Sequence, residues 1–114
     1  MFGYLRGGWQ LGPGEALVIE GDLVGCRYWN ALLYSRFLNS LDHRSRPVSI
    51  TGARAQVVDG RYRVVLSAER PPDRAGDWLD TEGRDTGIVV FRFLHPDGAV
   101  PLPTTTVVPV AQLS

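Results

Sequence analysis

Four carboxylates surround one tryptophan in a short polar stretch of the chain. Asp77, Asp80, Glu82 and Asp85 lie within nine residues of one another, on either side of Trp78. An indole ring stacks well on a sugar ring, and neighbouring carboxylates bind its hydroxyls or act as acid and base, so this stretch is a candidate carbohydrate site. In the structural alternative, the aspartates cap their own backbone in a turn and the tryptophan covers one end of the core.

A second polar group lies in the loop expected at residues 42–47. Asp42, His43, Arg44 and Arg46 precede Pro47 there. Cationic side chains in one loop are suited to a carboxylate or sulfate, whereas a solvated loop is the structural alternative. The candidate ligand-binding residues are therefore Trp78, Asp77, Asp80, Glu82, His43 and Arg44.

Other chemistry has little support in the sequence. His43 and His95 are the two histidines, too few for a histidine-rich metal centre in a β-barrel, and we expect no metal and no cofactor. No Gly-x-Ser-x-Gly turn marks a nucleophilic serine that would act with His43. Cys26 is the single cysteine, which excludes an intramolecular disulfide. We expect it to be a small buried residue, with a reactive thiol as the alternative.

The charge balance excludes further function classes. The 12 basic and 12 acidic residues cancel, so no net field attracts a nucleic acid. All 12 basic residues are arginines, which excludes lysine Schiff-base chemistry. No apolar stretch is long enough to span a membrane, and the first residues do not resemble a signal peptide. We expect a soluble, cytoplasmic protein with neither nucleic acid nor membrane as partner.

Short β-branched runs separated by Gly, Pro and Asp-Gly predict a mainly β protein. We expect strands at 15–20, 26–34, 48–58, 61–69, 88–94 and 104–108, and one short helical turn near 35–42. Asp59-Gly60 predicts a hairpin turn, and the apolar pattern of 26–34 predicts a central strand. Residues 104–108 should form an edge strand because prolines flank them. With 114 residues, we expect one domain, an antiparallel β-sandwich or jelly-roll-like barrel of roughly five to seven short strands.

Side-chain alternation assigns faces to two of these strands. In 61–69, Tyr62, Val64, Leu66 and Ala68 share one face, which predicts a half-buried strand. In 88–94, the expected core face carries Val89, Phe91 and Phe93. Arg92 lies on the opposite face, where we expect it to pair with an acid on a neighbouring strand. Residues 76–83 are expected to form a polar turn, after which the chain re-enters the sheet near Thr86.

The order of these motifs resembles the family called domain of unknown function 1214. The matching elements are Tyr28-Trp29-Asn30 with Tyr34, Asp59-Gly60, Gly76-Asp77-Trp78-Leu79, Gly87, Phe91-Arg92-Phe93-Leu94 and Pro96. The family's usual pattern has Asn before the Trp and Pro after the Leu, where this chain has Asp77 and Asp80. The resemblance implies a β-sandwich that forms the C-terminal part of a longer protein, often after a domain of unknown function 1254. It carries over no catalytic residue.

Two functions follow as hypotheses. The first is a non-catalytic interaction or binding domain, whose partner is an upstream domain, a second copy in a homodimer, or a small carbohydrate-like ligand near Trp78. The alternative is an enzyme domain, a hydrolase or isomerase of a sugar-like or small organic substrate, that uses Asp77, Asp80 or Glu82. Catalysis requires two of these acids to converge on a cleft beside Trp78, so the arrangement of the acids discriminates between the two hypotheses.

Overall fold

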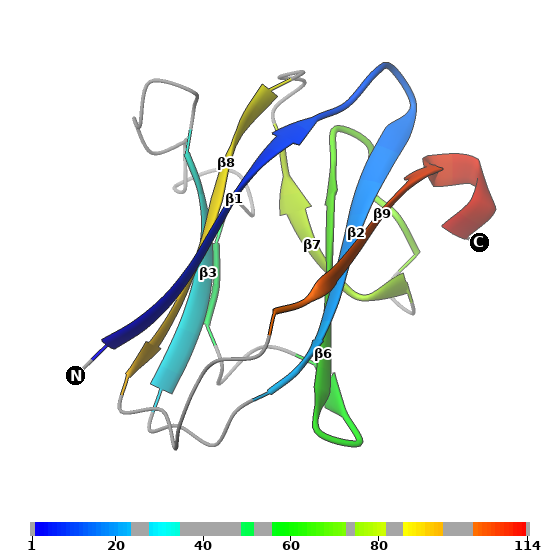
Figure 1. The fold of residues 1–114 in the computed structure, drawn as a ribbon. Helices are drawn as coiled ribbons and strands as arrows, with labels where there is room; N and C mark the ends of the chain where they lie inside the picture. Colours follow the sequence, from blue (N-terminus) through cyan, green and yellow to red (C-terminus); the bar gives the residue numbers. More distant parts are fainter. Residues whose placement is uncertain are drawn as a thin grey trace.

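Two β-sheets lie face to face in the computed structural model of this chain (Figure 1). The structure describes residues 2–23, 28–34, 49–51, 56–72, 75–81, 86–94 and 102–113. The first sheet has the order β1 (Phe2–Gln10), β8 (Thr86–Leu94), β3 (Tyr28–Tyr34), β4 (Ser49–Thr51). The second has the order β5 (Val57–Val58), β6 (Arg61–Ser67), β2 (Glu15–Asp22), β9 (Thr104–Pro109), and β7 (Asp77–Asp80) also pairs with β6. A short 3-10 turn, η2 (Val110–Leu113), follows β9.

The predicted fold class is confirmed. Every strand pair described is antiparallel except β6 with β7, which is parallel. The predicted number of strands was too low, since the described residues form nine, and the sequence assignment omitted β1 altogether. β3 is internal to its sheet and β9 lies at an edge, as predicted. The helical turn expected near residues 35–42 lies outside the described residues. No helix within the described ranges is long and apolar enough to cross a membrane.

Aromatic rings from both sheets form the centre of the core. The ring centroid of Trp29 lies 6.5 Å from that of Phe91 and 6.3 Å from that of Phe93. Tyr62 reaches them from the second sheet, with its centroid 5.5 Å from Trp29 and 5.3 Å from Phe91. Val89, Phe91 and Phe93 are buried, which confirms the predicted core face of β8. The core therefore depends on the alternation of side chains along β3, β6 and β8.

The Asp-Gly hairpin turn is confirmed, but its first arm is not one strand. Asp59 and Gly60 have φ angles of 52° and 73°, and they connect β5 to β6. The expected strand at 48–58 is divided between the two sheets, because β4 pairs with β3 whereas β5 pairs with β6. An Asp-Gly turn specifies pairing only for the residues next to it. The residues of β4 were therefore free to pair with the other sheet.

The strand β6 is buried on both faces over its second half, not on one face as predicted. Tyr62, Val64 and Leu66 face the main core. Val65, on the opposite face, belongs to a second apolar cluster. That cluster contains Ala16, Val18, Val65 and Ala75, with Val108, Val110 and Leu113 packed against it. The end of the chain therefore covers part of the outer face of the second sheet.

Candidate functional site

The acidic stretch around Trp78 forms a strand, not the polar turn that the sequence predicted. Residues Asp77–Asp80 make β7, which pairs in parallel with β6 so that Asp77 lies beside Val64 and Asp80 beside Ser67. Gly76 precedes the strand with a φ of 133°, and a Cβ there would lie 2.7 Å from the Arg63 carbonyl oxygen. Glycine is thus required for β7 to approach β6. Leu79 is fully buried, and this burial of apolar surface also stabilises β7.

The two aspartates of β7 occupy opposite faces of the sheet. Asp77 is on the same face as Leu79, toward the core, whereas Asp80 is on the same face as Trp78. Both aspartates are buried, at 7 % and 5 % relative exposure. Because residues three apart in a strand face opposite ways, these carboxylates do not converge on one substrate. They therefore do not meet the condition set above for acid–base catalysis beside Trp78.

Asp77 is a buried carboxylate held by the backbone. Its Oδ2 accepts a hydrogen bond of 2.8 Å from the backbone N–H of Gln56. Burial raises the pKa of Asp77 above its ordinary value, and the Gln56 hydrogen bond opposes this shift only in part. The contact joins the segment before β5 to β7. The described contact of Asp77 is structural, because it connects two segments of the backbone.

The indole of Trp78 is engaged on its edge and on one face. Its Nε1 donates a hydrogen bond of 3.1 Å to the carbonyl oxygen of Ser67. The guanidinium carbon of Arg70 lies over the ring, 5.6 Å from its centroid. Ser67 is tied in turn to the loop after β6, because its hydroxyl donates to the Glu69 carbonyl at 2.6 Å. A sugar stacking on Trp78 would have to use the other ring face or displace Arg70.

The remaining candidate residues lie outside the described part of the chain. These are Glu82, His43 and Arg44, and the same holds for Cys26 and His95. Their roles stay predictions. Within the described ranges, no three His, Cys, Asp or Glu side chains gather as metal ligands would.

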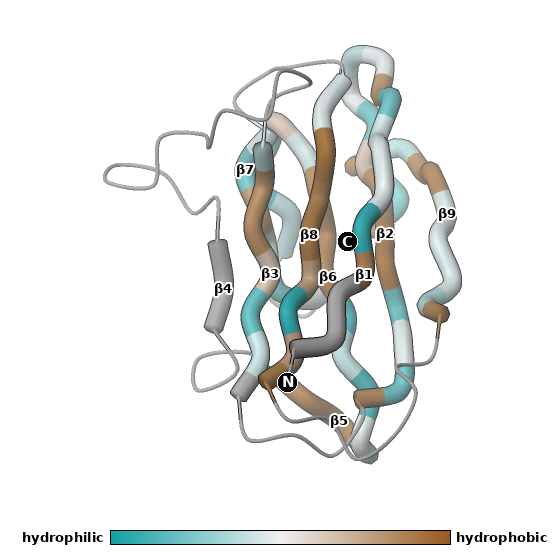
Figure 2. Tube along the Cα trace, turned by 60° about the vertical axis from the view of Figure 1, so that its left-hand side comes forward, coloured by the Kyte–Doolittle hydropathy of each residue, from teal (hydrophilic) through white to brown (hydrophobic). Residues whose placement is uncertain are grey.

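The outer face of the first sheet carries a group of apolar side chains that was not predicted from the sequence. Half-buried side chains cover it on its two central strands: Leu32 of β3 and Ile88, Val90 and Leu94 of β8. We call this surface the β8 face. Figure 2 shows the apolar stretch through the middle of β8. The signal was present in the sequence, because a strand that is apolar at both odd and even positions is normally covered on both faces.

Arg92 is the charged residue of β8 on this outer face. Its Nη2 donates a hydrogen bond of 2.9 Å to the hydroxyl of Tyr34 on β3. The predicted acid partner is therefore wrong, since a tyrosine takes that place among the described residues. Arg92 lies between Val90 and Leu94 on the β8 face, and Tyr34 lies beside Ile88.

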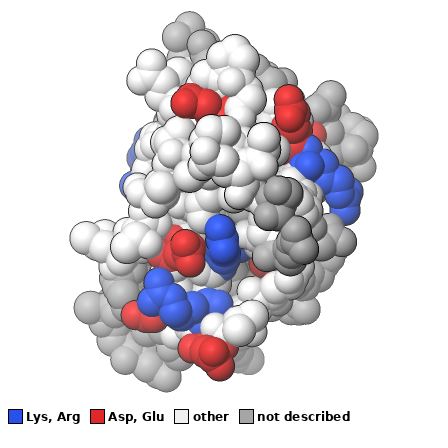
Figure 3. Space-filling model, turned by 90° about the vertical axis from the view of Figure 1, so that its right-hand side faces the viewer, with Lys and Arg blue, Asp and Glu red and all other residues white. Residues whose placement is uncertain are grey.

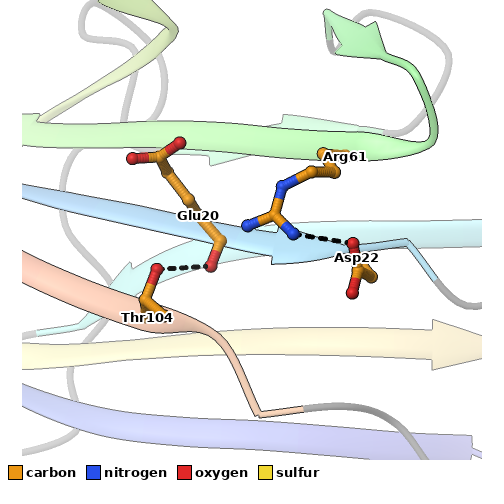
Figure 4. A network of polar contacts seen from close by, with 4 residues as sticks. All are labelled: Glu20, Asp22, Arg61 and Thr104. Atoms are coloured by element: carbon orange, nitrogen blue, oxygen red, sulfur yellow. Dashed lines mark hydrogen bonds and ion pairs between the residues drawn. The ribbon is translucent and has the colours of Figure 1, made fainter.

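The outer face of the second sheet differs, because charged side chains of both signs cover its open half. Figure 3 shows these charges intermixed. Arg61 of β6 reaches Asp22 of β2 in an ion pair of 2.8 Å, and the Thr104 hydroxyl of β9 donates to the Glu20 carbonyl at 3.3 Å (Figure 4). The other half of this face carries the second apolar cluster. The two sheets thus present unlike surfaces to their surroundings.

Comparison with solved structures identifies the fold but no activity. An uncharacterised protein from Burkholderia cenocepacia has a TM-score of 0.89 and 34 % sequence identity, over 97 % of this chain and 31 % of that one. A protein from Vibrio parahaemolyticus has a TM-score of 0.71 and 18 % identity, over 94 % of this chain and 30 % of that one. The chain thus spans about a third of the length of both. No protein-family model and no curated protein matches it.

Proposed function

We propose that this β-sandwich is a non-catalytic interaction domain that packs against another protein domain through the β8 face. The observation that carries the proposal is the row of outward-facing Ile88, Val90 and Leu94 beside Leu32. Water does not solvate such a surface favourably, and covering it yields roughly 25 cal/mol for each Å² of apolar area buried. A second layer on the first sheet therefore has a clear driving force.

The contrast between the two sheets supports this choice of surface. The second sheet is covered by residues of its own chain and by charged groups that water solvates well. On the first sheet the charged residues described on the outer face are Arg92 of β8 and Arg6 of the edge strand β1, which lies opposite Val90, and no acid is described there beside them. Sheets with apolar residues on both faces are found between two other layers. The partner thus belongs on the first sheet.

The lengths of the two solved structures described above support a partner domain over a small ligand. In both, the matched fold makes up about a third of the polypeptide, 31 % and 30 %. Further polypeptide therefore accompanies the fold in those proteins. The resemblance to domain of unknown function 1214 is part of the proposal, because its implied upstream domain is a partner of this kind. A second copy of this chain is the alternative occupant.

The geometry of β7 argues against the enzyme alternative. Asp77 and Asp80 face opposite sides of the sheet, and Asp77 is engaged by a backbone N–H. A hydrolase or isomerase would need Glu82 and a further group to converge without them. Carbohydrate binding at Trp78 stays a prediction, which requires a free ring face beside Arg70.

The test is the association state of the purified chain, followed by size-exclusion chromatography with light scattering over a concentration series. We expect association that grows with concentration, because the β8 face is then its own best partner. Val90→Glu should suppress it, since a charge in the interface would be desolvated. Thr106→Glu is the control, because Thr106 is exposed on the edge strand of the second sheet. A wild-type chain that remains monomeric throughout, or equal effects of both variants, would contradict the proposal.

A further inference from the structure

Two arginines lie beside Val90 on the outer face of the first sheet. Arg6 of β1 is directly opposite Val90 in the register of β1 with β8. Arg92 is two residues further along β8, on the same face as Val90. Opposite and diagonal neighbours on one face of an antiparallel pair are within reach of long side chains. We call Arg6 and Arg92 the arginine pair, and it borders the apolar side chain of Val90 on two sides.

The first sheet supplies no acid for the arginine pair. None of its four strands contains an aspartate or a glutamate. Arg6 is exposed and makes no hydrogen bond or ion pair within the described part of the chain. Arg92 is half-buried and donates to the Tyr34 hydroxyl, and its buried Nε has no partner among the described residues. The positive charge of this face is therefore not balanced within the sheet.

The second sheet treats its outward arginines differently. Arg61 and Arg63 are on the outer face of β6, and each is directly opposite an acid of β2: Arg61 lies across from Asp22 and Arg63 from Glu20. The first of these two pairs is the ion pair of 2.8 Å. An arginine on that sheet thus has its counter-charge on the neighbouring strand. The arginine pair of the first sheet lacks such a neighbour on the surface where the partner is proposed to pack.

Covering the β8 face would remove the arginine pair from water together with the apolar side chains. A charge that is desolvated without gaining a partner opposes association. A carboxylate compensates an arginine well, because it accepts two parallel hydrogen bonds from the guanidinium group. An apolar surface without acids would therefore bind this face less tightly than one that carries them.

We propose that the partner of the β8 face is an acidic protein surface, which packs apolar side chains on Ile88, Val90 and Leu94 and places carboxylates at the arginine pair. This inference rests on the proposed function, because it concerns the same face. It disfavours a second copy of the chain, since two identical faces would bring arginines against arginines. A protein is favoured over an anionic lipid surface, because the matched fold is about a third of a longer polypeptide in both solved structures.

The experiment uses a charge-reversed copy of the chain, Arg6→Glu with Arg92→Glu, as the probe of an acidic apolar face. Composition-gradient light scattering measures its association with the wild type without a label. We expect this mixed pair to form at least ~10-fold more tightly than the wild-type pair, because its charges are complementary. Added salt should weaken the mixed pair and strengthen the wild-type pair, since it screens attraction in the first and repulsion in the second.

Arg61→Glu with Arg63→Glu is the matched control, because it changes the net charge equally on the outer face of the second sheet. This control should bind the wild type no more tightly than the wild type binds itself. Thermal melting followed by circular dichroism checks that each variant folds. If the charge-reversed copy does not fold, Arg6→Glu alone changes an exposed residue and should still give about a two- to fivefold preference.

Equal affinities of the mixed pair and the wild-type pair would overturn this inference, and so would an equal preference for the control. The proposed function would survive either result if Val90→Glu still suppressed the association, so the two failures are distinguishable. Absence of any association would overturn both. Binding of the wild type to phosphatidylserine vesicles that the control retains and the charge-reversed copy loses would also overturn the inference, in favour of a membrane partner.

Discussion

The indole of Trp9 lies against Gly87 and leaves no room for a side chain at that position. The two residues are opposite one another in the β1–β8 pair, and the indole lies across the glycine. A Cβ on Gly87 would lie 2.2 Å from Cη2 and 2.3 Å from Cζ2 of Trp9, far inside van der Waals contact. Trp9 is 4 % exposed, so its ring has no free space into which it moves easily. Gly87→Ala should therefore destabilise the chain.

The magnitude follows from the two ways of relieving the clash. Small shifts of an overpacked core cost about 1–3 kcal/mol. Expelling the ring instead loses the burial of a tryptophan, at about 3–5 kcal/mol. We expect a decrease of about 2–4 kcal/mol in the free energy of unfolding, a large part of the ~5–15 kcal/mol that holds a typical domain folded.

Urea denaturation followed by far-ultraviolet circular dichroism measures this change without using tryptophan fluorescence as the signal. Gly8→Ala is the control, because its new Cβ makes only the 3.7 Å contact with the Gly87 carbonyl. It should be neutral or stabilise by about 0.5–1 kcal/mol, since glycine within a strand loses more conformational entropy than alanine. The reasoning is refuted if Gly87→Ala unfolds within about 0.5 kcal/mol of wild type, or if Gly8→Ala is equally harmful.

Two further substitutions test buried polar groups. Asp77→Asn should raise the free energy of unfolding at neutral pH, because the pKa of the Asp77 carboxyl is higher in the folded chain than its ordinary value of 3.8. The stability of the wild type should therefore fall as the pH rises from 3.8 through the raised pKa of Asp77. Urea titrations of the variant should not show this fall. Tyr62→Phe should be neutral or stabilising at neutral pH, because the buried Tyr62 hydroxyl has no hydrogen-bond partner among the residues that the structure describes. Burial raises the pKa of Tyr62 from 10.0 to about 12, so the free energy of unfolding of the wild type should fall between these two pH values. The fall should be smaller in Tyr62→Phe. Parallel plots of stability against pH for the two proteins would contradict this prediction.

Local signals in the sequence were sufficient for some elements. The alternation along β8 predicted which of its residues face the core, because side chains in a strand have a period of two. Asp59-Gly60 predicted its own turn, because both residues adopt the positive φ that a two-residue hairpin turn requires. In both cases the information lies in a few neighbouring residues.

Elements that depend on distant partners were not predictable in this way. β1 carries three glycines, Gly3, Gly7 and Gly8, which have low β propensity, and it is stabilised by pairing with β8. β7 looked like a turn because aspartates dominate it, yet parallel pairing with β6 makes it a strand. The candidate site was affected by the same error. Acids three residues apart look clustered in sequence, but a strand places them on opposite faces.

The second sheet indicates what the first sheet lacks. Val65 faces outward from β6 and is fully buried, because Val108, Val110 and Leu113 pack on its cluster. A backbone hydrogen bond of 2.8 Å from Val110 N–H to the Gly14 carbonyl fixes this covering segment in place. Val90 has the equivalent outward position on β8, and it is only half buried. In the proposed function, a partner on the β8 face would supply for Val90 what the C-terminal segment supplies for Val65, which is an apolar layer.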